Sequence, residues 1–481
     1  MIRRLASAAI VVAWVGSASP APAADDVPSA DKIREHVLAV VGPPLASYRE
    51  TLDETAFGLR RHSVVVAAGA DYREPTDAGP LHTASGVYHG QRWRQNANGE
   101  TILAPPNPGL VAPESYTTSV RRVTTPVDGY VVSSLDRAGY GTKRYVEAAT
   151  WHEVRTESIR ASGITVTTYE DFRSIGGHVF PFHDFTSDGH VENDRDTRIA
   201  EIRSEPIADA ELVIPPARRA FVEFPSGETS VKLPVREDRG KFIVTVNVGT
   251  RALDMVLDSG AAGIVIEEGV AKQLGLQEFG SESNGVNSGR FRSTSAIVPE
   301  MSVGDLEMHD VAINTVPSVG VTGQFGEYRA VGLLGFDFID AIVLELDYRN
   351  QTATAYAPQS FAASTSPDDF TLDLRVGNGQ PMISIGVDGA VGERFVMDTG
   401  GFGSLVFFDR FVRRNSAALV DEGGGGAMRN VQLNGIGGAF AVKPYQLPRV
   451  DFGPIAFHDF LTYAVTQHGA YDGSADGIVG P

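Results

Sequence analysis

The sequence contains no cysteine in its 481 residues. Disulfide bonds, thiolate metal sites and cysteine nucleophiles are therefore excluded, and with them several classes of hydrolase and redox protein. A chain without disulfides depends on packing for its stability, and a hydrophobic content of 42% is ordinary for a globular core. The length favours several domains over a single one.

Tryptophan and positive charge are both scarce. Three tryptophans stand against 52 glycines and 27 prolines, which predicts many turns, short strands and hence a mainly β fold. The formal net charge is −19. Such an acidic surface argues against nucleic acid and against anionic membrane surfaces as partners.

Long apolar runs are missing after the first residues. There, Arg3 and Arg4 precede an apolar stretch from Leu5 to Val15, and small residues follow. This order is typical of a secretory signal, and we expect a signal peptide over residues 1–23 with cleavage after Ala23. Because about 20 apolar residues are needed to span a bilayer, we expect no transmembrane anchor. The predicted location is outside the cytoplasm, either periplasmic or secreted.

Residues 24–216 are predicted to form an N-terminal antiparallel β domain. A short helix is expected at Ala30–Val41, and from about Ser63 short apolar runs such as Ile164–Tyr169 alternate with turn residues. Turn pairs such as Asp188-Gly189 separate these runs, as in a sequence of antiparallel strands.

From about Phe221 the chain repeats itself. Two predicted strands with a turn at Gly249-Thr250 lead into Asp258-Ser259-Gly260, and two more with a turn near Asp388-Gly389 lead into Asp398-Thr399-Gly400. Two later blocks recur in the same order: Val303–Val311 is echoed by Phe452–Phe460, and Val331–Gly335 by Asp476–Gly480. The sequence therefore predicts an internal duplication, with lobe one at 217–357, a linker at 358–370 and lobe two at 371–481.

Each Asp-Ser/Thr-Gly motif follows an apolar strand. Glycine at the third position lets the backbone turn sharply, which leaves the carboxylate at the end of the strand. The hydroxyl at the second position can bond neighbouring backbone and hold the loop in place. One such motif alone is more often a turn or a helix cap. Two copies in matching surroundings indicate a shared site.

On these motifs, Phe221–Pro481 resembles the pepsin and retropepsin class of aspartic proteases, with both lobes in one chain. The resemblance implies a duplicated, two-lobed acid-protease-like β-barrel unit with Asp258 and Asp398 as the catalytic pair. It implies that their loops are supported by Ser259, Gly260, Thr399 and Gly400. It also implies substrate-binding flap hairpins at 284–294 and 434–442, whose candidate residues are Asn284, Gly285, Gly435, Gly437 and Gly438.

Two neighbouring carboxylates cannot both ionise easily, so they share one proton and their apparent pKa values separate. The ionised member activates a water, and the protonated member polarises the carbonyl of an extended polypeptide substrate. This chemistry needs no metal or cofactor. Ala261 and Gly401 follow the motifs and offer no hydroxyl donor, so we expect a pH optimum nearer mildly acidic or neutral than strongly acidic.

The N-terminal domain has a resemblance of its own. The segment Tyr145–Pro216 resembles the curved half-barrel domains of periplasmic lipoprotein carriers, in a rhythm that includes Thr150-Trp151, Gly177–Phe182 and Thr197–Ser204. The resemblance implies a surface for a lipid or an extended chain. The alternative is a domain that only supports, masks or docks the rest.

Lobe two departs from lobe one at its end. In lobe one, Phe336–Tyr356 follow the last repeated block, whereas lobe two reaches Pro481 directly after that block. Its closing hairpin is therefore expected to be missing, either because the sequence is a fragment or because lobe two is unusually short. This departure favours a competing hypothesis, a non-catalytic extracytoplasmic binding protein with degenerate protease lobes. An intermediate possibility is that lobes pair between chains.

Two histidines, His309 and His458, stand at equivalent positions in the two repeats. Because neither has an i,i+4 partner, we interpret both as structural residues rather than as metal ligands.

Overall fold

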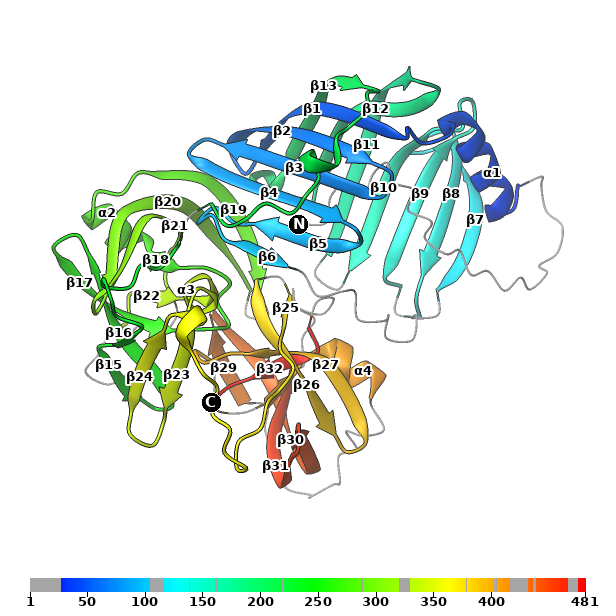
Figure 1. Ribbon diagram of the computed structural model, residues 1–481. Helices are drawn as coiled ribbons and strands as arrows, with labels where there is room; N and C mark the ends of the chain where they lie inside the picture. The colour runs from blue at the N-terminus through cyan, green and yellow to red at the C-terminus, as the bar shows by residue number, and fades with distance from the viewer. Residues whose placement is uncertain are drawn as a thin grey trace. The chain divides into compact units, whose positions relative to one another are not determined.

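The computed structural model describes residues 27–103, 116–137, 139–160, 163–218, 220–286, 289–319, 329–377, 379–401, 403, 405–415, 431–435, 438–465 and 475–481. Strands dominate these residues and the helices among them are short (Figure 1). The predicted mainly β fold with an N-terminal antiparallel sheet is confirmed. The expected signal peptide lies outside the described residues. Among the described helices, none is long and apolar enough to cross a membrane.

The chain divides into two compact units. One comprises Met1–Asn96 with Thr101–Pro216, and the other comprises Ala97–Glu100 with Ala217–Pro481. The first unit contains a single 13-stranded sheet of the order β6-β5-β4-β3-β2-β1-β13-β12-β11-β10-β9-β8-β7 (Figure 1). Its strands are β1 (Ser47–Ala56), β2 (Leu59–Ala68), β3 (Asp71–Ala78), β4 (Leu81–Tyr88), β5 (Gln91–Gln95), β6 (Thr101–Leu103), β7 (Thr117–Val123), β8 (Gly129–Leu135), β9 (Gly141–Glu147), β10 (Glu153–Arg160), β11 (Gly163–Ile175), β12 (His178–Ser187) and β13 (Arg195–Arg203).

The sheet begins earlier than the apolar runs of the sequence suggested, at β1. This strand is mostly polar, yet it buries every second residue at its start, including Tyr48, Glu50 and Leu52. The period-two alternation of a half-buried strand is therefore present, but Glu50 hides it in the sequence. A buried carboxylate of this kind is not anticipated from hydrophobic patterning alone.

The helix α1 (Ala30–Val41) has the bounds predicted from the sequence. Ser29 caps its start, where the side-chain oxygen accepts a hydrogen bond from Lys32 N at 3.2 Å. Gly42 ends it with φ +75° and donates to Leu38 O at 3.0 Å. Ile33 is buried in a cluster with Val132 and Val146, so one helix face packs on the sheet.

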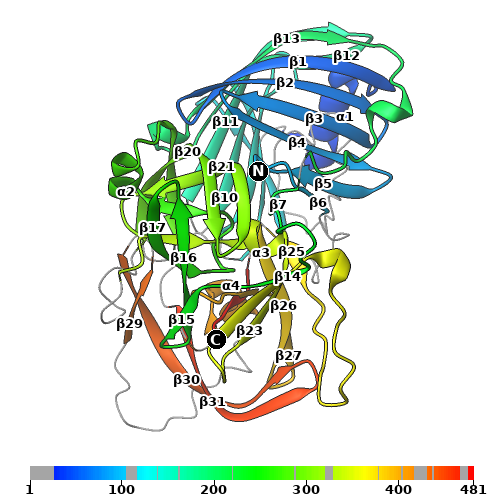
Figure 2. The same ribbon diagram turned by 60° about the vertical axis from the view of Figure 1, so that its left-hand side comes forward.

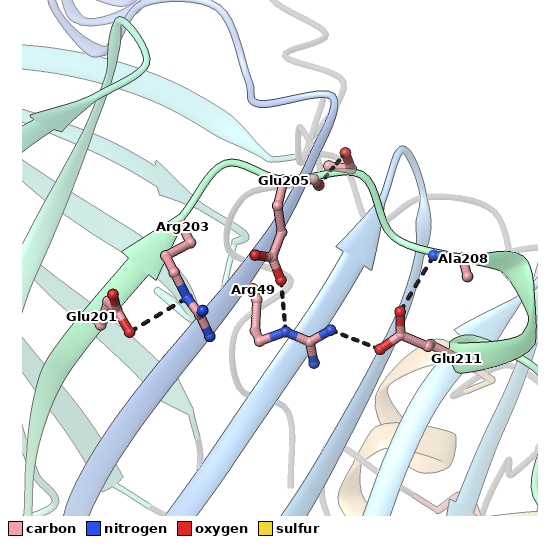
Figure 3. A network of polar contacts seen from close by, with 7 residues as sticks. Arg49, Glu201, Arg203, Glu205, Ala208 and Glu211 are labelled. Carbon is pink, nitrogen blue, oxygen red and sulfur yellow. Dashed lines mark hydrogen bonds and ion pairs between the residues drawn. The ribbon is translucent and has the colours of Figure 1, made fainter.

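Charged side chains bind the segment that follows β13 to strand β1 (Figure 3). The guanidinium of Arg49 on β1 donates to Glu205 at 2.8 Å and to Glu211 at 2.7 Å. Ser47 Oγ also donates to Glu205 O at 2.7 Å. Hydrogen bonding to Arg49 lowers the pKa of Glu211 below the ordinary value of a glutamate.

The second unit contains two eight-stranded sheets with the same strand order (Figures 1 and 2). The sheet of lobe one has the order β15-β16-β17-β22-β18-β21-β20-β19. Its strands are β15 (Val235–Asp238), β16 (Lys241–Val248), β17 (Arg251–Leu257), β18 (Val265–Glu267), β19 (Glu278–Val286), β20 (Gly289–Val303), β21 (Leu306–Val316) and β22 (Gly332–Leu334), with helices α2 (Glu268–Gln273) and α3 (Phe336–Asp340).

The sheet of lobe two has the order β25-β26-β27-β32-β28-β31-β30-β29. Its strands are β25 (Arg375–Gly377), β26 (Gln380–Val387), β27 (Ala390–Met397), β28 (Leu405–Phe407), β29 (Val431–Gly435), β30 (Gly438–Phe452), β31 (Ile455–Val465) and β32 (Gly477–Val479), with helix α4 (Asp409–Arg414). The agreement with lobe one extends to the backbone. Asp310 and Asp459, which the sequence blocks place at equivalent positions, both have positive φ, 48° and 52°.

Lobe one also carries a three-stranded sheet of the order β14-β24-β23. Its strands are β14 (Ser230–Lys232), β23 (Val343–Asp347) and β24 (Thr352–Tyr356), and their residues Val231, Ala353 and Ala355 belong to the main core of this lobe. The described residues of lobe two form no such sheet. Met308 of lobe one is fully buried at 0% exposure, whereas its equivalent in lobe two, Phe457, is 43% exposed.

Candidate active site

The two Asp motifs lie where the second long strand of each lobe ends. Asp258 follows β17, whose last residues Met255–Leu257 are fully buried. β22 runs parallel beside β17, and its Leu334 O accepts a hydrogen bond from Asp258 N at 3.1 Å. The chain then turns sharply, with Ala261 N donating to Asp258 O at 3.2 Å. The buried strand and its neighbour thus fix the start of the loop.

Lobe two builds its loop in the same way. Asp398 follows β27, which pairs with β32 in parallel. Asp398 N donates to Val479 O at 2.9 Å, and Gly401 N donates to Asp398 O at 3.1 Å. The repeated apolar-Gly blocks of the sequence thus supply the strand beside each motif, β22 in one lobe and β32 in the other.

The hydroxyl groups of the two motifs join the loops across the lobes. Ser259 Oγ donates to Met397 O at 2.5 Å, and Thr399 Oγ1 donates to Leu257 O at 2.8 Å. Each hydroxyl oxygen also accepts from the other motif's backbone, Ser259 N to Thr399 Oγ1 and Thr399 N to Ser259 Oγ, both at 3.0 Å. The four bonds are reciprocal, so the position of each loop depends on the other.

The glycines of the motifs bring the carboxyl groups together. A Cβ atom placed on Gly260 would lie 2.4 Å from Asp398 Cγ, and one placed on Gly400 would lie 2.4 Å from Asp258 Cγ. Only glycine leaves this space, because any side chain would occupy the volume of the opposite carboxyl group. Each Asp is therefore packed against the other lobe's glycine.

Backbone N–H groups point at both carboxylates. Asp258 Oδ1 accepts from Gly260 N at 2.9 Å and from Ala261 N at 3.1 Å. Asp398 Oδ1 accepts from Gly400 N at 3.0 Å. Such donors favour the ionised form of a carboxyl group.

Burial and mutual repulsion act against ionisation. Desolvation raises the pKa of Asp258 well above its usual range, and the charge of Asp398 and the hydrogen bond between the two carboxyls raise it further. Desolvation also raises the pKa of Asp398, but the hydrogen bond from Asp258, the charge of Lys241 and the loop N–H groups oppose this rise. Burial thus disfavours ionisation of both carboxyls, which favours a pair that shares one proton.

The residues proposed for the flaps lie at the ends of two hairpins. Asn284 and Gly285 are in β19 near the turn to β20, and Asn284 Nδ2 donates to Ser293 Oγ at 2.6 Å. In lobe two, Gly435 ends β29 and pairs with Gly438, the first residue of β30. Gly437 lies outside the described residues. A role of these residues in substrate binding stays a prediction.

Two polar residues beside the motifs were missed by the sequence reasoning. Lys241 Nζ donates to Gly400 O and Gly401 O, and Gln380 Nε2 donates to Gly260 O. Both are the first residues of equivalent strands, β16 and β26. Counting back from the Asp motifs pairs Lys241 with Pro381 rather than with Gln380, so the repeat alone does not reveal their equivalence. No pattern in the sequence indicates how far their side chains reach.

We expect Thr399→Val to weaken the connection between the lobes. The substitution leaves Leu257 O without its donor and Ser259 N without its acceptor. Unsatisfied buried partners of this kind cost about 1–3 kcal/mol of unfolding free energy, which urea unfolding of the whole chain measures. Thr250→Val, in the exposed β16–β17 turn, is the matched control. Equal stability of the two variants would contradict the cross-lobe role.

We also expect Asp258→Asn to stabilise the fold at neutral pH. Because the pKa of Asp258 is raised in the folded state, the folded chain holds this proton above the unfolded pKa, and unfolding free energy falls as pH rises through the folded value. The asparagine removes this dependence. The variant should therefore gain stability over wild type at neutral pH, and the gain should shrink towards about pH 4. A gain that is constant with pH, or one shared by the exposed control Asp305→Asn, would reject this account.

The chain was compared with known families, curated proteins and solved structures. No curated protein matches the chain. Similar solved structures include a retropepsin-like aspartic protease from Rickettsia conorii, with 15% identity and a TM-score of 0.21 over 26% of this chain and 98% of that one. They include a LolA superfamily protein from Nitrosomonas europaea, with 14% identity and a TM-score of 0.29 over 38% and 97% of the two chains.

A third similar structure is a putative outer membrane lipoprotein-sorting protein domain from Vibrio parahaemolyticus. It has 9% identity and a TM-score of 0.27 over 36% of this chain and 90% of that one. Residues 243–338, which contain Asp258 and most of the lobe-one sheet, match the aspartyl protease family model.

Proposed function

We propose that this chain is an exported aspartic-type endopeptidase that uses Asp258 and Asp398 as a pair sharing one proton. The observation that supports the proposal most is the approach of each Asp to the other lobe's glycine, 2.4 Å from a Cβ placed there. The match of residues 243–338 to the aspartyl protease family supports the same class of chemistry. Export is proposed from the signal expected at residues 1–23.

The roles of the two carboxyls follow from their ionisation. Asp398, as the ionised member, takes a proton from a water whose oxygen attacks the carbonyl carbon of a peptide bond. Asp258, as the protonated member, donates a hydrogen bond to the carbonyl oxygen and stabilises the charge that develops there. When the tetrahedral intermediate collapses, Asp398 gives the proton it took from the water to the nitrogen, the C–N bond breaks, and the pair again holds one proton. The products are a carboxylic acid and an amine.

The substrate is proposed to be an extended polypeptide. Such a chain would lie between the carboxyls and the β19–β20 and β29–β30 hairpins, and its backbone would pair with strand edges. The tips of such hairpins can move to admit and enclose the substrate. Asn284, Gly285, Gly435, Gly437 and Gly438 are the residues proposed to line this path.

A peptide-library digest tests the proposal. Purified wild type should cleave peptides, and Asp258→Asn and Asp398→Asn should each lose activity by about 10²–10⁴-fold, because each removes one half of the acid–base pair. Asp305→Asn, in the exposed β20–β21 turn, should cleave like wild type. Cleavage that is unchanged in both site variants would reject the pair. No cleavage by wild type would favour a non-catalytic binding protein.

The pH dependence gives a second test. The pKa of Asp258 is raised, so the singly protonated pair persists to higher pH than two ordinary carboxyls would allow. The profile of kcat/KM against pH should therefore peak at mildly acidic to neutral pH. A maximum well below about pH 4, the ordinary pKa of an aspartate, would contradict this expectation.

A further inference from the structure

Each lobe sends one polar side chain from the start of its first long strand to the other lobe's Asp loop. Lys241 opens β16 and donates to Gly400 O and Gly401 O. Gln380 opens β26 and donates to Gly260 O. The two strands hold equivalent places in the two sheets. The arrangement is symmetric in position but unequal in charge, because one lobe supplies a cation and the other a neutral amide.

Two of the carbonyls that receive these bonds, Gly260 O and Gly400 O, belong to peptide groups whose N–H faces a carboxylate. The Gly260–Ala261 peptide accepts from Gln380 through its oxygen and donates to Asp258 Oδ1 through Ala261 N at 3.1 Å. The Gly400–Gly401 peptide accepts from Lys241 through Gly400 O. Gly401 N donates to Asp398 O at 3.1 Å, and its hydrogen bonding to the carboxyl group lowers the pKa of Asp398. A donor on the oxygen of a peptide group polarises it and strengthens its N–H as a donor. A cation does so more strongly than a neutral amide.

We propose that Lys241 is a positioning residue that makes Asp398 the ionised member of the pair, by holding and polarising the Gly400–Gly401 peptide. Gln380 holds the matching peptide at Asp258 through a neutral bond. Two chemically identical aspartates thereby take different roles. This inference rests on the proposed function, since it assigns the base and the acid of that same site.

Lys241 also interacts electrostatically with both carboxyls. Burial lowers the pKa of Lys241, whereas the charges of Asp398 and Asp258 raise it, and Lys241 in turn opposes the rise of pKa at both aspartates. Other charged groups on neighbouring elements have partners of their own. On the β15–β16 hairpin, Glu237 accepts from Gly240 N at 2.5 Å and Arg239 lies 3.8 Å from Asp238.

Three further elements lie beside the loops, α3 on the side of Asp258 and the strands β28 and β32 on the side of Asp398. Asp337 of α3 accepts from Asn98 at 3.2 Å. β28 (Leu405–Phe407) and β32 (Gly477–Val479) contain no charged residue. Asp476, before β32, lies 3.6 Å from Arg410 and 3.5 Å from Arg414.

Lys241→Gln is the decisive variant, because it gives both lobes the same neutral amide. Losing the cation raises the pKa of the ionised carboxyl, so the acid limb of the kcat/KM profile should move to higher pH. On that limb kcat/KM should fall by on the order of tenfold, through kcat rather than KM. Gln380→Leu should leave the limb where it is. Lys272→Gln, an exposed lysine on α2 that pairs with Glu268, is the charge-matched control.

A purely structural role of Lys241 predicts a different result. The loss of activity would then be the same at every pH, without movement of the limb, and that outcome overturns the inference. Lys241→Arg, which keeps the cation, should restore the wild-type limb if charge is what matters. Failure of Lys241→Arg to do so in a folded variant would also overturn it.

A measurement without activity separates this inference from the proposed function. The carboxyl carbons of ¹³C-labelled aspartate report ionisation directly, and Asp258→Asn and Asp398→Asn assign the two signals. If Lys241→Gln raises the titration midpoint of Asp398 while the wild-type protein cleaves no peptide, the inference stands and the proposed function fails. If peptides are cleaved and the midpoint of Asp398 does not move, the inference fails and the function stands.

Discussion

The reciprocal hydrogen bonds between Ser259 and Thr399 are the constraint on which the candidate site depends. Each hydroxyl donates to the strand that carries the other lobe's Asp and accepts from the other loop's backbone. Neither loop has a complete set of partners in its own lobe. Two sheets with independent cores are thus joined at the point where their carboxyls meet, and the seam between the lobes is also the site.

The same seam explains why the carboxyls are difficult to ionise. Desolvation is the largest cause of the raised pKa at both, and the loop N–H groups and Lys241 offset only part of it. An arrangement of this kind costs folding free energy, as expected where like charges are held close together. Packing of strands such as β17 and β27, whose inner residues are fully buried, supplies the stability that keeps the pair together.

Much of this architecture could be predicted from local sequence. The strands leading to Asp258 and Asp398 and the turns at Gly249 and Gly389 followed from apolar runs and turn residues, and the helix at Ala30–Val41 was expected with the bounds that it has. β1 was missed because its buried Glu50 breaks the apolar pattern. The reach of Lys241 across the lobes was missed because it depends on how two sheets meet, which no run of neighbouring residues records.

Equivalence in sequence also did not predict equivalence in burial. Leu306 and Ile455 occupy the same place in the two repeats, yet Leu306 is 0% exposed and Ile455 is 38% exposed. The difference comes from strands outside the repeat, since the β14-β24-β23 sheet adds to the core of lobe one. A residue's surroundings thus depend on segments far from it in the chain, which a comparison of short blocks omits.

The close approach of Gly260 to Asp398, and of Gly400 to Asp258, has a consequence for how this sequence can change over time. The requirement for glycine at each position is imposed by a carboxyl in the other half of the chain. Elsewhere the halves can drift apart in sequence, as their different core residues illustrate. At Gly260 and Gly400 they cannot, because a side chain that one half could accommodate by itself would clash with the carboxyl group of the other half. The two motifs are therefore constrained together in their evolution.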